Sequence, residues 1–305
     1  SYFRGIESVS RKTQHETSEA LRKLHPYISE DFVHNFAGEV DPHQVERAFG
    51  MRAVEKLAEL TKFPDLSKEG RATALRILVA ISVTQEEKQN AVSAGIIESC
   101  TALLDDDDSS VREHAASAIA SISLAQQSRK NIEKAQTISI LCEKIADPEV
   151  AVRESASLAL LNISISRRGA DMIVATESAI EKIVTAVGDV SKHVSLYLVS
   201  CLVNSARYGR GVQLALDAGA VEKVISLLRT CPATTDPKSL SGLLVQTLNA
   251  IWNLANELEG KDQLIGADAV ELISVSLFDE SIDVKRCAAG ALMALSVQEY
   301  GKSQI

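Results

Sequence analysis

Aromatic residues are scarce in this chain of 305 residues, where they make up 4% of the sequence and include a single Trp. Apolar residues still make up 46%, so a core must be built from Ala, Leu, Ile and Val, as in closely stacked helices. No apolar run approaches the roughly 18 residues that a membrane span needs, and the start, SYFRGIESVSRKT, lacks the apolar centre of a signal peptide. We therefore expect a soluble intracellular protein with no membrane partner.

Basic residues are fewer than acidic ones, 32 against 41, which gives a net charge of −9. This balance argues against nucleic acid or anionic lipid as the main partner and favours a basic protein surface. The cysteines are odd in number and widely spaced, which fits a reduced compartment such as the cytoplasm. They are Cys100, Cys142, Cys201, Cys231 and Cys287.

Motifs for catalysis are also missing. The six histidines have no metal-ligand spacing with one another or with cysteine. The tripeptide Gly301, Lys302 and Ser303 resembles the end of a phosphate-binding loop, but the required earlier Gly falls on Ser296. No nucleophile motif occurs. The sequence predicts neither an enzyme nor a protein that binds a cofactor, a metal or a small-molecule substrate.

What the sequence does contain is a repeat. Residues 111–123 read VREHAASAIASIS, and residues 152–164 read VRESASLALLNIS. The first residue of this phrase, here called place zero, recurs at intervals of 41, 41, 42, 49 and 41. Place zero is Gly70, Val111, Val152, Val194, Leu243 and Val284. Places four, seven, eight and eleven are mostly apolar or small, which predicts one buried stripe on an α-helix.

Two shorter helical phrases precede each of these helices, so a repeat holds three helices, and Gly precedes the second in several units. A period near 42 residues is typical of armadillo and HEAT repeats. The three-helix unit predicts an all-α armadillo-repeat solenoid, a right-handed superhelix, with HEAT as the alternative. We also expect a capping box of Ser110 and Glu113, and an N-cap at Asp147 followed by Pro148.

The repeats predict the domain organisation. Residues 41–305 form an armadillo domain of about six units, and the last unit is incomplete because EYGKSQI resembles the start of another. Residues 1–40 do not fit the repeat, and we expect a helical N-terminal cap or a docking arm, with a helix over about 13–24. The long interval places an insertion in the loop 229–242, whose prolines stop a helix.

Candidate partner-binding residues lie at places six and ten of the third helix. In armadillo proteins that bind extended peptides, Asn at place ten lines the concave groove, where an amide can both donate to and accept from a peptide backbone. Asn tolerated near a helix end is the alternative explanation. The candidates for the concave groove are Arg76, Ser121, Asn162, Ser200, Asn204, Asn249 and Asn253.

The aromatic half of the Trp/Asn ladder of nuclear-import adaptors is absent at place six. Trp252 is three residues out of register with Asn162 and Asn204, so it is expected to face a different side. A soluble adaptor of the nuclear-import or signalling type therefore stays an alternative function.

Three phrases resemble the armadillo-repeat radial spoke head protein of motile cilia and flagella, the family numbered fourteen among the spoke head homologues. They are ERAFGMRAVEKL at 46–57, LALLNISISRRG at 158–169 and AAGALMALSVQEYGK at 288–302. The resemblance implies a non-enzymatic structural subunit of the axoneme, located with the cytoskeleton of the cilium, that holds segments of other radial spoke subunits. Another axonemal armadillo protein, of the central apparatus or of dynein docking, is a further alternative.

Overall fold

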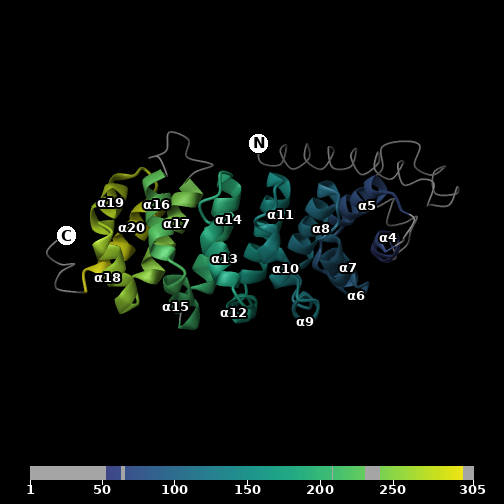
Figure 1. Cartoon of the computed structure of the whole chain (residues 1–305), viewed down its shortest axis with the longest axis horizontal. Helices are drawn as coiled ribbons and strands as arrows, with labels where there is room; N and C mark the ends of the chain where they lie inside the picture. The colour runs from purple at the N-terminus through teal and green to yellow at the C-terminus, as the bar shows by residue number, and fades with distance from the viewer. Residues whose placement is uncertain (1–52, 63–65, 208, 231–240, 298–305) are drawn as a thin grey trace. The chain divides into compact units, whose positions relative to one another are not determined.

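The structure is a computed structural model, and it describes residues 53–62, 66–207, 209–230 and 241–297. These residues form helices joined by short turns, with no strand among them (Figure 1). The chain divides into two compact units, residues 1–140 and 141–305.

The helices follow one another in groups of three. Their bounds are α4 Ala53–Thr61, α5 Lys68–Ile81, α6 Gln85–Ser93, α7 Ile96–Leu103, α8 Ser109–Ile122, α9 Ser128–Lys134, α10 Thr137–Lys144, α11 Val150–Ser164, α12 Arg167–Ala175, α13 Ala179–Ala186, α14 Lys192–Ser205, α15 Arg210–Asp217, α16 Ala220–Thr230, α17 Ser241–Leu254, α18 Leu258–Gly266, α19 Ala269–Val275, the 3-10 turn η3 Ser276–Phe278 and α20 Ile282–Leu295.

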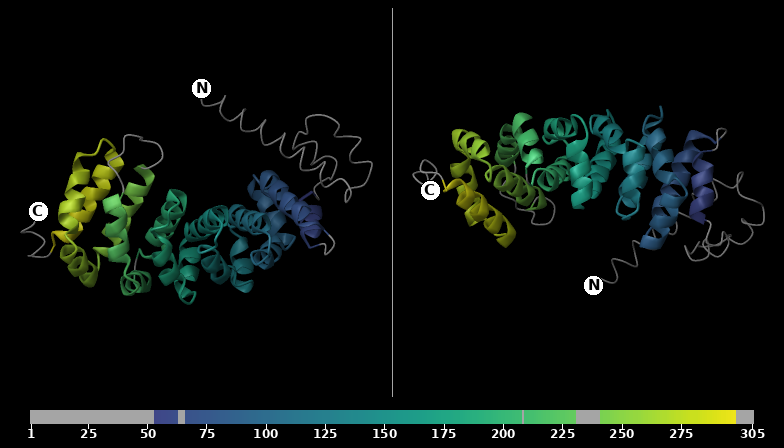
Figure 2. Two further views of the ribbon diagram at one scale, coloured as in Figure 1. Left: turned by 45° about the horizontal axis from the view of Figure 1, so that its top comes forward. Right: turned by 90° about the horizontal axis from the view of Figure 1, so that it is seen from below.

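The predicted repeat is confirmed helix by helix. The third helices of the repeats are α5, α8, α11, α14, α17 and α20, and every one begins two residues before place zero. In the second unit α11 packs on α14, α14 on α17 and α17 on α20, whereas α5 packs on α8 in the first. Figure 2 shows the helices in two further views, coloured by residue number as in Figure 1. An all-helical repeat stack is therefore the architecture of both units.

The stripe predicted on the third helix is the core. At places four, seven, eight and eleven every side chain is buried except that of Ile81, which is half-buried. Place four is Ala in four of the six repeats, and Ala74, Ala115 and Ala156 are fully buried. Small residues there let adjacent helices approach closely, which compensates for the lack of aromatic side chains.

A left-handed residue separates the first helix from the second in five repeats. The backbone φ angles are 75° at Gly95 and 77° at Gly219, the glycines that the sequence analysis used to define the repeat. The same place in the other three repeats has φ between 54° and 57°, at Gln136, Ser178 and Asp268. The turn geometry is thus common to all five repeats, and three of them adopt it without glycine at some cost in backbone strain.

The two predicted helix starts are wrong in detail. Helix α8 is capped by Asp108, whose carboxylate accepts from the backbone N–H groups of Ser110 and Val111, so Ser110 is not the N-cap. The N-cap of α11 is Glu149, and the Asp147 carboxylate accepts from the Glu149 N–H in the turn before the helix. Asp106 and Asp147 occupy the same place before their third helices, and each carboxylate accepts from the backbone N–H two residues later. This Asp turn, which precedes the N-cap, leads into the third helix.

Several expectations lie outside the described residues. These are the cap or arm at 1–40, most of the loop 229–242 and the partial repeat after residue 297. Within the described ranges, no helix is long and apolar enough to span a membrane. The same ranges contain no group of three or more His, Cys, Asp or Glu residues that could hold a metal ion.

Candidate partner-binding face

The candidate residues of the second unit lie on its four third helices. We call the surface formed by places six and ten of α11, α14, α17 and α20 the third-helix face. Its members are Leu158, Asn162, Ser200, Asn204, Asn249, Asn253, Gly290 and Ala294. Because these helices pack in series, the same place in successive repeats forms a row across the unit. The side chains of Asn162, Asn204, Asn249 and Asn253 are all half-buried.

Two amides of place ten hydrogen-bond to the preceding repeat. Asn204 donates from Nδ2 to Oγ of Ser164 over 3.0 Å, and Asn253 donates from Nδ2 to the backbone oxygen of Val203 over 2.9 Å. The hydroxyl of Ser164 in turn donates to the Leu161 carbonyl at 2.6 Å. Each of these two amides therefore tethers its helix to the end of the neighbouring third helix and is held in one orientation.

The same two amides still have groups that are free to form hydrogen bonds. An Asn side chain has two N–H groups and an acceptor oxygen, and neither Asn204 nor Asn253 makes any further side-chain hydrogen bond within the described residues. Asn249, at place six, makes no side-chain hydrogen bond within those residues. Ser200 is buried and donates within its own helix to the Leu196 carbonyl at 2.7 Å, so its hydroxyl proton is already used.

The remaining two candidates belong to the first unit. Arg76 is exposed on α5, and Ser121 is half-buried on α8. These two helices pack on each other, which places both candidates on neighbouring repeats. The sequence grouped them with the amides of the second unit, and they are described here only within their own unit.

Trp252 occupies a position that its register did not suggest. Its indole is half-buried against α20, where a Cβ atom built on Gly290 would lie 2.5 to 2.7 Å from three ring carbons. Gly290 is place six of its repeat, so the ring fills that place from the neighbouring helix. An aromatic ring therefore lies beside place six of α20, and it comes from the third helix one repeat earlier.

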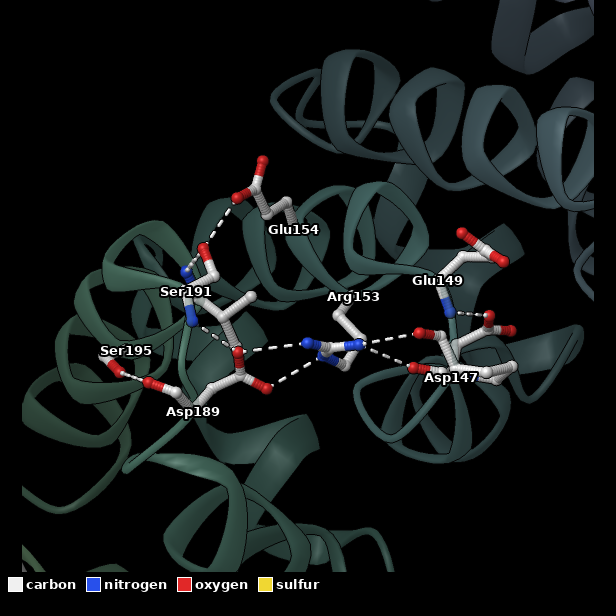
Figure 3. Close-up of polar contacts among 9 residues, drawn as sticks. Asp147, Glu149, Arg153, Glu154, Asp189, Ser191 and Ser195 are labelled. Carbon is white, nitrogen blue, oxygen red and sulfur yellow. Dashed lines mark hydrogen bonds and ion pairs between the residues drawn. The ribbon is translucent and has the colours of Figure 1, made fainter.

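The main polar contact between repeats in the second unit is centred on Arg153, in the first turns of α11 (Figure 3). Its Nε and Nη2 donate to the two carboxylate oxygens of Asp189 over 2.8 and 3.3 Å. Its Nη1 donates to the backbone oxygens of Asp147 and Pro148 over 2.9 and 3.1 Å. One guanidinium therefore joins its own entry turn to that of the next repeat.

Neighbouring groups extend this contact, which we call the Arg153 joint. The Asp189 carboxylate also accepts from the backbone N–H of Ser191 at 2.7 Å. The Ser191 hydroxyl donates to Glu154 at 2.6 Å. Side chains of Arg153 and Asp189 are 12% and 13% exposed, so the pair is shielded from water and its hydrogen bonds are worth more than those of a surface pair.

The first unit has similar contacts between arginines and the turns that lead into the third helices. Arg71 and Asp106 form an ion pair with 3.4 Å between Nη1 and Oδ2. Arg112 donates from Nη1 to the backbone oxygens of Asp106 and Asp107 over 2.9 and 3.1 Å. These contacts were not predicted, although the sequence contains a signal for them. Arg occupies place one in three successive repeats, and Arg71 and Arg153 precede the Asp with which they pair by 35 and 36 residues.

The described cysteines are buried free thiols. Burial raises the pKa of the Cys201 thiol to about 12, and burial likewise raises the pKa of the Cys142 thiol to about 12. Cys201 also donates from Sγ to the Leu160 carbonyl at 3.6 Å. At neutral pH these thiols are therefore protonated. Since only a thiolate acts as a nucleophile or metal ligand, they serve as packing groups in the core.

Comparison with known proteins supports the fold. The family model of non-SMC mitotic condensation complex subunit 1 matches residues 71–210. An engineered protein of known crystal structure is 26% identical, with a TM-score of 0.71 over 80% of this chain and 96% of that one. A search of curated proteins found no match.

Designed armadillo repeat proteins give similar results. One is 24% identical with a TM-score of 0.69, covering 79% of this chain and 99% of its own. Another, solved in complex with the peptide (KR)4, is 23% identical with the same TM-score and the same coverage. Together with the three-helix units, these similarities show that the chain has an armadillo-type helical repeat fold, a fold suited to a scaffold for protein–protein interaction.

Proposed function

We propose that this protein is a non-catalytic scaffold whose third-helix face holds an extended segment of a partner protein. The observation that carries the proposal is the pair of tethered amides, Asn204 and Asn253. Each is oriented by a hydrogen bond to the preceding repeat and keeps an oxygen and an N–H for a ligand. Groups fixed before binding lose little conformational entropy on binding, so a backbone laid across the row would meet prepositioned donors and acceptors.

The partner, in this proposal, is another subunit of the ciliary radial spoke, and the protein is a structural component of the axoneme. The support is the resemblance of three phrases to the radial spoke head family, of which 158–169 includes Asn162 and its neighbours. A repeat stack gives a long surface with many side chains for its length, which suits a subunit that contacts several others at once.

The location of the endogenously tagged protein in a ciliated cell tests this proposal, measured before and after detergent removal of the membrane and soluble matrix. A structural subunit stays along the stripped axoneme, and its deletion removes radial spokes. Retention without spoke loss would point instead to the central apparatus or dynein docking. A signal that washes out with the matrix would contradict the structural role.

A soluble peptide-binding adaptor is the second candidate. The designed armadillo protein in complex with (KR)4 supports it, since that protein binds a basic peptide and this chain carries a net charge of −9. A tagged protein found in the nucleus would favour this function. A signal on mitotic chromosomes would favour a role like that of the condensation complex family matched at 71–210.

Replacing Asn162, Asn204 and Asn253 together by Ala tests the face itself. The variant should remain folded and fail to assemble into axonemes, because the row of amides is removed while the core is untouched. Normal assembly of a folded variant would contradict the role of the third-helix face.

A further inference from the structure

Four arginines gather at one edge of the second unit, in a chain whose net charge is negative. Arg167 and Arg168 are the first two residues of α12, Arg207 lies in the turn after α14, and Arg210 is the first residue of α15. All four are exposed. Helices α12 and α15 pack on each other, so these residues, the arginine edge, belong to neighbouring repeats.

Three of the four arginines are not placed for helix stability. Arg167, Arg168 and Arg210 lie in the first turns of α12 and α15, where the positive end of the helix dipole disfavours a cation. Neither of these turns has an acidic residue that would offset the charge. The equivalent first helix of the next repeat, α18, follows the usual preference, with Glu257 at the N-cap and Glu259 in the first turn. The edge thus changes from basic to acidic between α15 and α18.

Most of the arginine edge is unpaired. Arg167, Arg207 and Arg210 make no ion pair or side-chain hydrogen bond with any residue that the structure describes. This distinguishes them from Arg153, all of whose guanidinium nitrogens donate to backbone or carboxylate oxygens. Exposed cations without a partner among the described residues, two of them in an unfavourable first turn, are available for a ligand of opposite charge.

The arginine edge adjoins the ends of the third helices. A Cβ atom at Gly169 would lie 1.8 Å from the Ile163 carbonyl oxygen, and one at Gly211 would lie 2.1 Å from that of Ser205. The first turns of α12 and α15 are therefore pressed against the last turns of α11 and α14. The arginines accordingly flank the end of the third-helix face where Asn162 and Asn204 lie.

We propose that the arginine edge binds an acidic segment of a partner polypeptide. Arginine pairs with carboxylates through two parallel hydrogen bonds, which lysine cannot do. Packed helices lie roughly 10 Å apart, and three residues of an extended chain span about the same distance. Acidic residues three apart in an extended segment therefore match the spacing of the two repeats.

Nucleic acid fits this edge less well. A polyanion of uniform charge gains from a long basic track, whereas this track covers two repeats and then meets Glu257 and Glu259. A short acidic segment ends before that repulsion begins. The inference does not depend on the third-helix face or on a ciliary location, because it concerns a separate surface.

Fluorescence anisotropy with two labelled peptides tests the proposal on the full chain. One peptide carries two Glu-Glu pairs three residues apart in a flexible Ser/Gly background, and the other has Gln in place of every Glu. The triple variant R167Q/R207Q/R210Q removes the three arginines of the edge that have no partner among the described residues. The matched control, K192Q/K223Q/K285Q, removes the same charge from exposed lysines elsewhere in the second unit.

We expect the native chain to bind the Glu peptide and not the Gln peptide at low salt. The edge variant should lose at least tenfold in affinity, while the lysine control changes less than threefold. Equal losses in both variants, or no binding by the native chain, would overturn the proposal. So would a single-stranded oligonucleotide that displaces the peptide and binds more tightly through the same arginines.

The variant with Asn162, Asn204 and Asn253 replaced by Ala separates this inference from the proposed function. It should bind the Glu peptide within twofold of the native chain, since the arginine edge is intact. Circular dichroism of each variant confirms that the fold is retained.

Discussion

Arg153 and the arginine edge, both in the second unit, use the same type of side chain in opposite ways. Arg153 lies between repeats with 12% of its side chain exposed and donates four hydrogen bonds, two of them to Asp189. The arginine edge lies in the first turns of α12 and α15 and in the turn between α14 and α15, and three of its members have no partner among the described residues. The difference separates residues that hold the stack together from residues available to a partner, although the residue type is identical.

The largest effect expected from breaking this contrast is at Arg153. Replacing Arg153 by Ala removes the ion pair with Asp189, whose carboxylate keeps only the Ser191 N–H as a donor, and the hydrogen bonds to two turn carbonyls. The loss should cost about 3 kcal/mol in the free energy of unfolding. Urea denaturation measures it. Arg153→Lys should recover only part of the loss, because an ammonium cannot pair with both oxygens while reaching the carbonyls. Full stability of Arg153→Ala would show that the joint is dispensable.

A smaller effect is expected where the joint between repeats is apolar. Gly290→Ala puts a Cβ atom 2.5 Å from a ring carbon of Trp252 and should cost about 2 kcal/mol through overpacking. The double variant Gly290→Ala/Trp252→Leu should lose less unfolding free energy than the sum of the losses in the two single variants, because the smaller Leu side chain leaves room for the new Cβ atom. Simple additivity in thermal or urea unfolding would argue against this contact.

The amides are intermediate between the two arginine sets, since they both hold the stack and keep free hydrogen-bonding groups. Asn253→Ala removes the hydrogen bond to the Val203 carbonyl and should cost about 1 kcal/mol. Asn249→Ala, the matched control on the same helix without such a bond, should change stability by less than about 0.5 kcal/mol. Equal costs for the two variants would show that the tether of Asn253 is not structural.

The smallest effect has the opposite sign. The variant R167Q/R210Q removes cations from the first turns of α12 and α15 and should raise the free energy of unfolding by about 0.5 kcal/mol at low ionic strength. Added salt should reduce this gain. A loss of stability instead would place these arginines with Arg153, as structural residues, and remove the contrast.

Much of the repeat could be predicted from the sequence because it depends on local pattern. The stripe at places four, seven, eight and eleven fixed the third helices, and Gly95 and Gly219 marked the turn before the second. The same turn at Gln136 and Ser178 could not be recognised, because those residues rarely adopt a positive φ. The predicted N-caps were wrong for a related reason. Both Asp and Ser can cap a helix, and only the path of the chain decides which of them takes the N-cap position.

The candidate site was predictable in position but not in bonding. Spacing placed Asn204 and Asn253 on one row, yet it gave no hint that both donate to the preceding repeat. The same holds for Trp252, whose register within its own helix did not reveal that it fills the place above Gly290. Such contacts join residues about 40 to 50 positions apart, where the offset between stacked helices decides which atoms meet.

The sequence by itself determined that the chain is a stack of three-helix repeats with a small-residue core, because helical periodicity and the recurrence of one phrase are local properties. Only the tertiary structure decided which polar side chains form ion pairs or hydrogen bonds within the chain. Arg153 and Arg167 look alike in the sequence, but one meets a carboxylate of the next repeat and the other points from a helix start with no partner in the described chain. That distinction arises only when the repeats are packed, since it depends on the distance between groups far apart in the sequence.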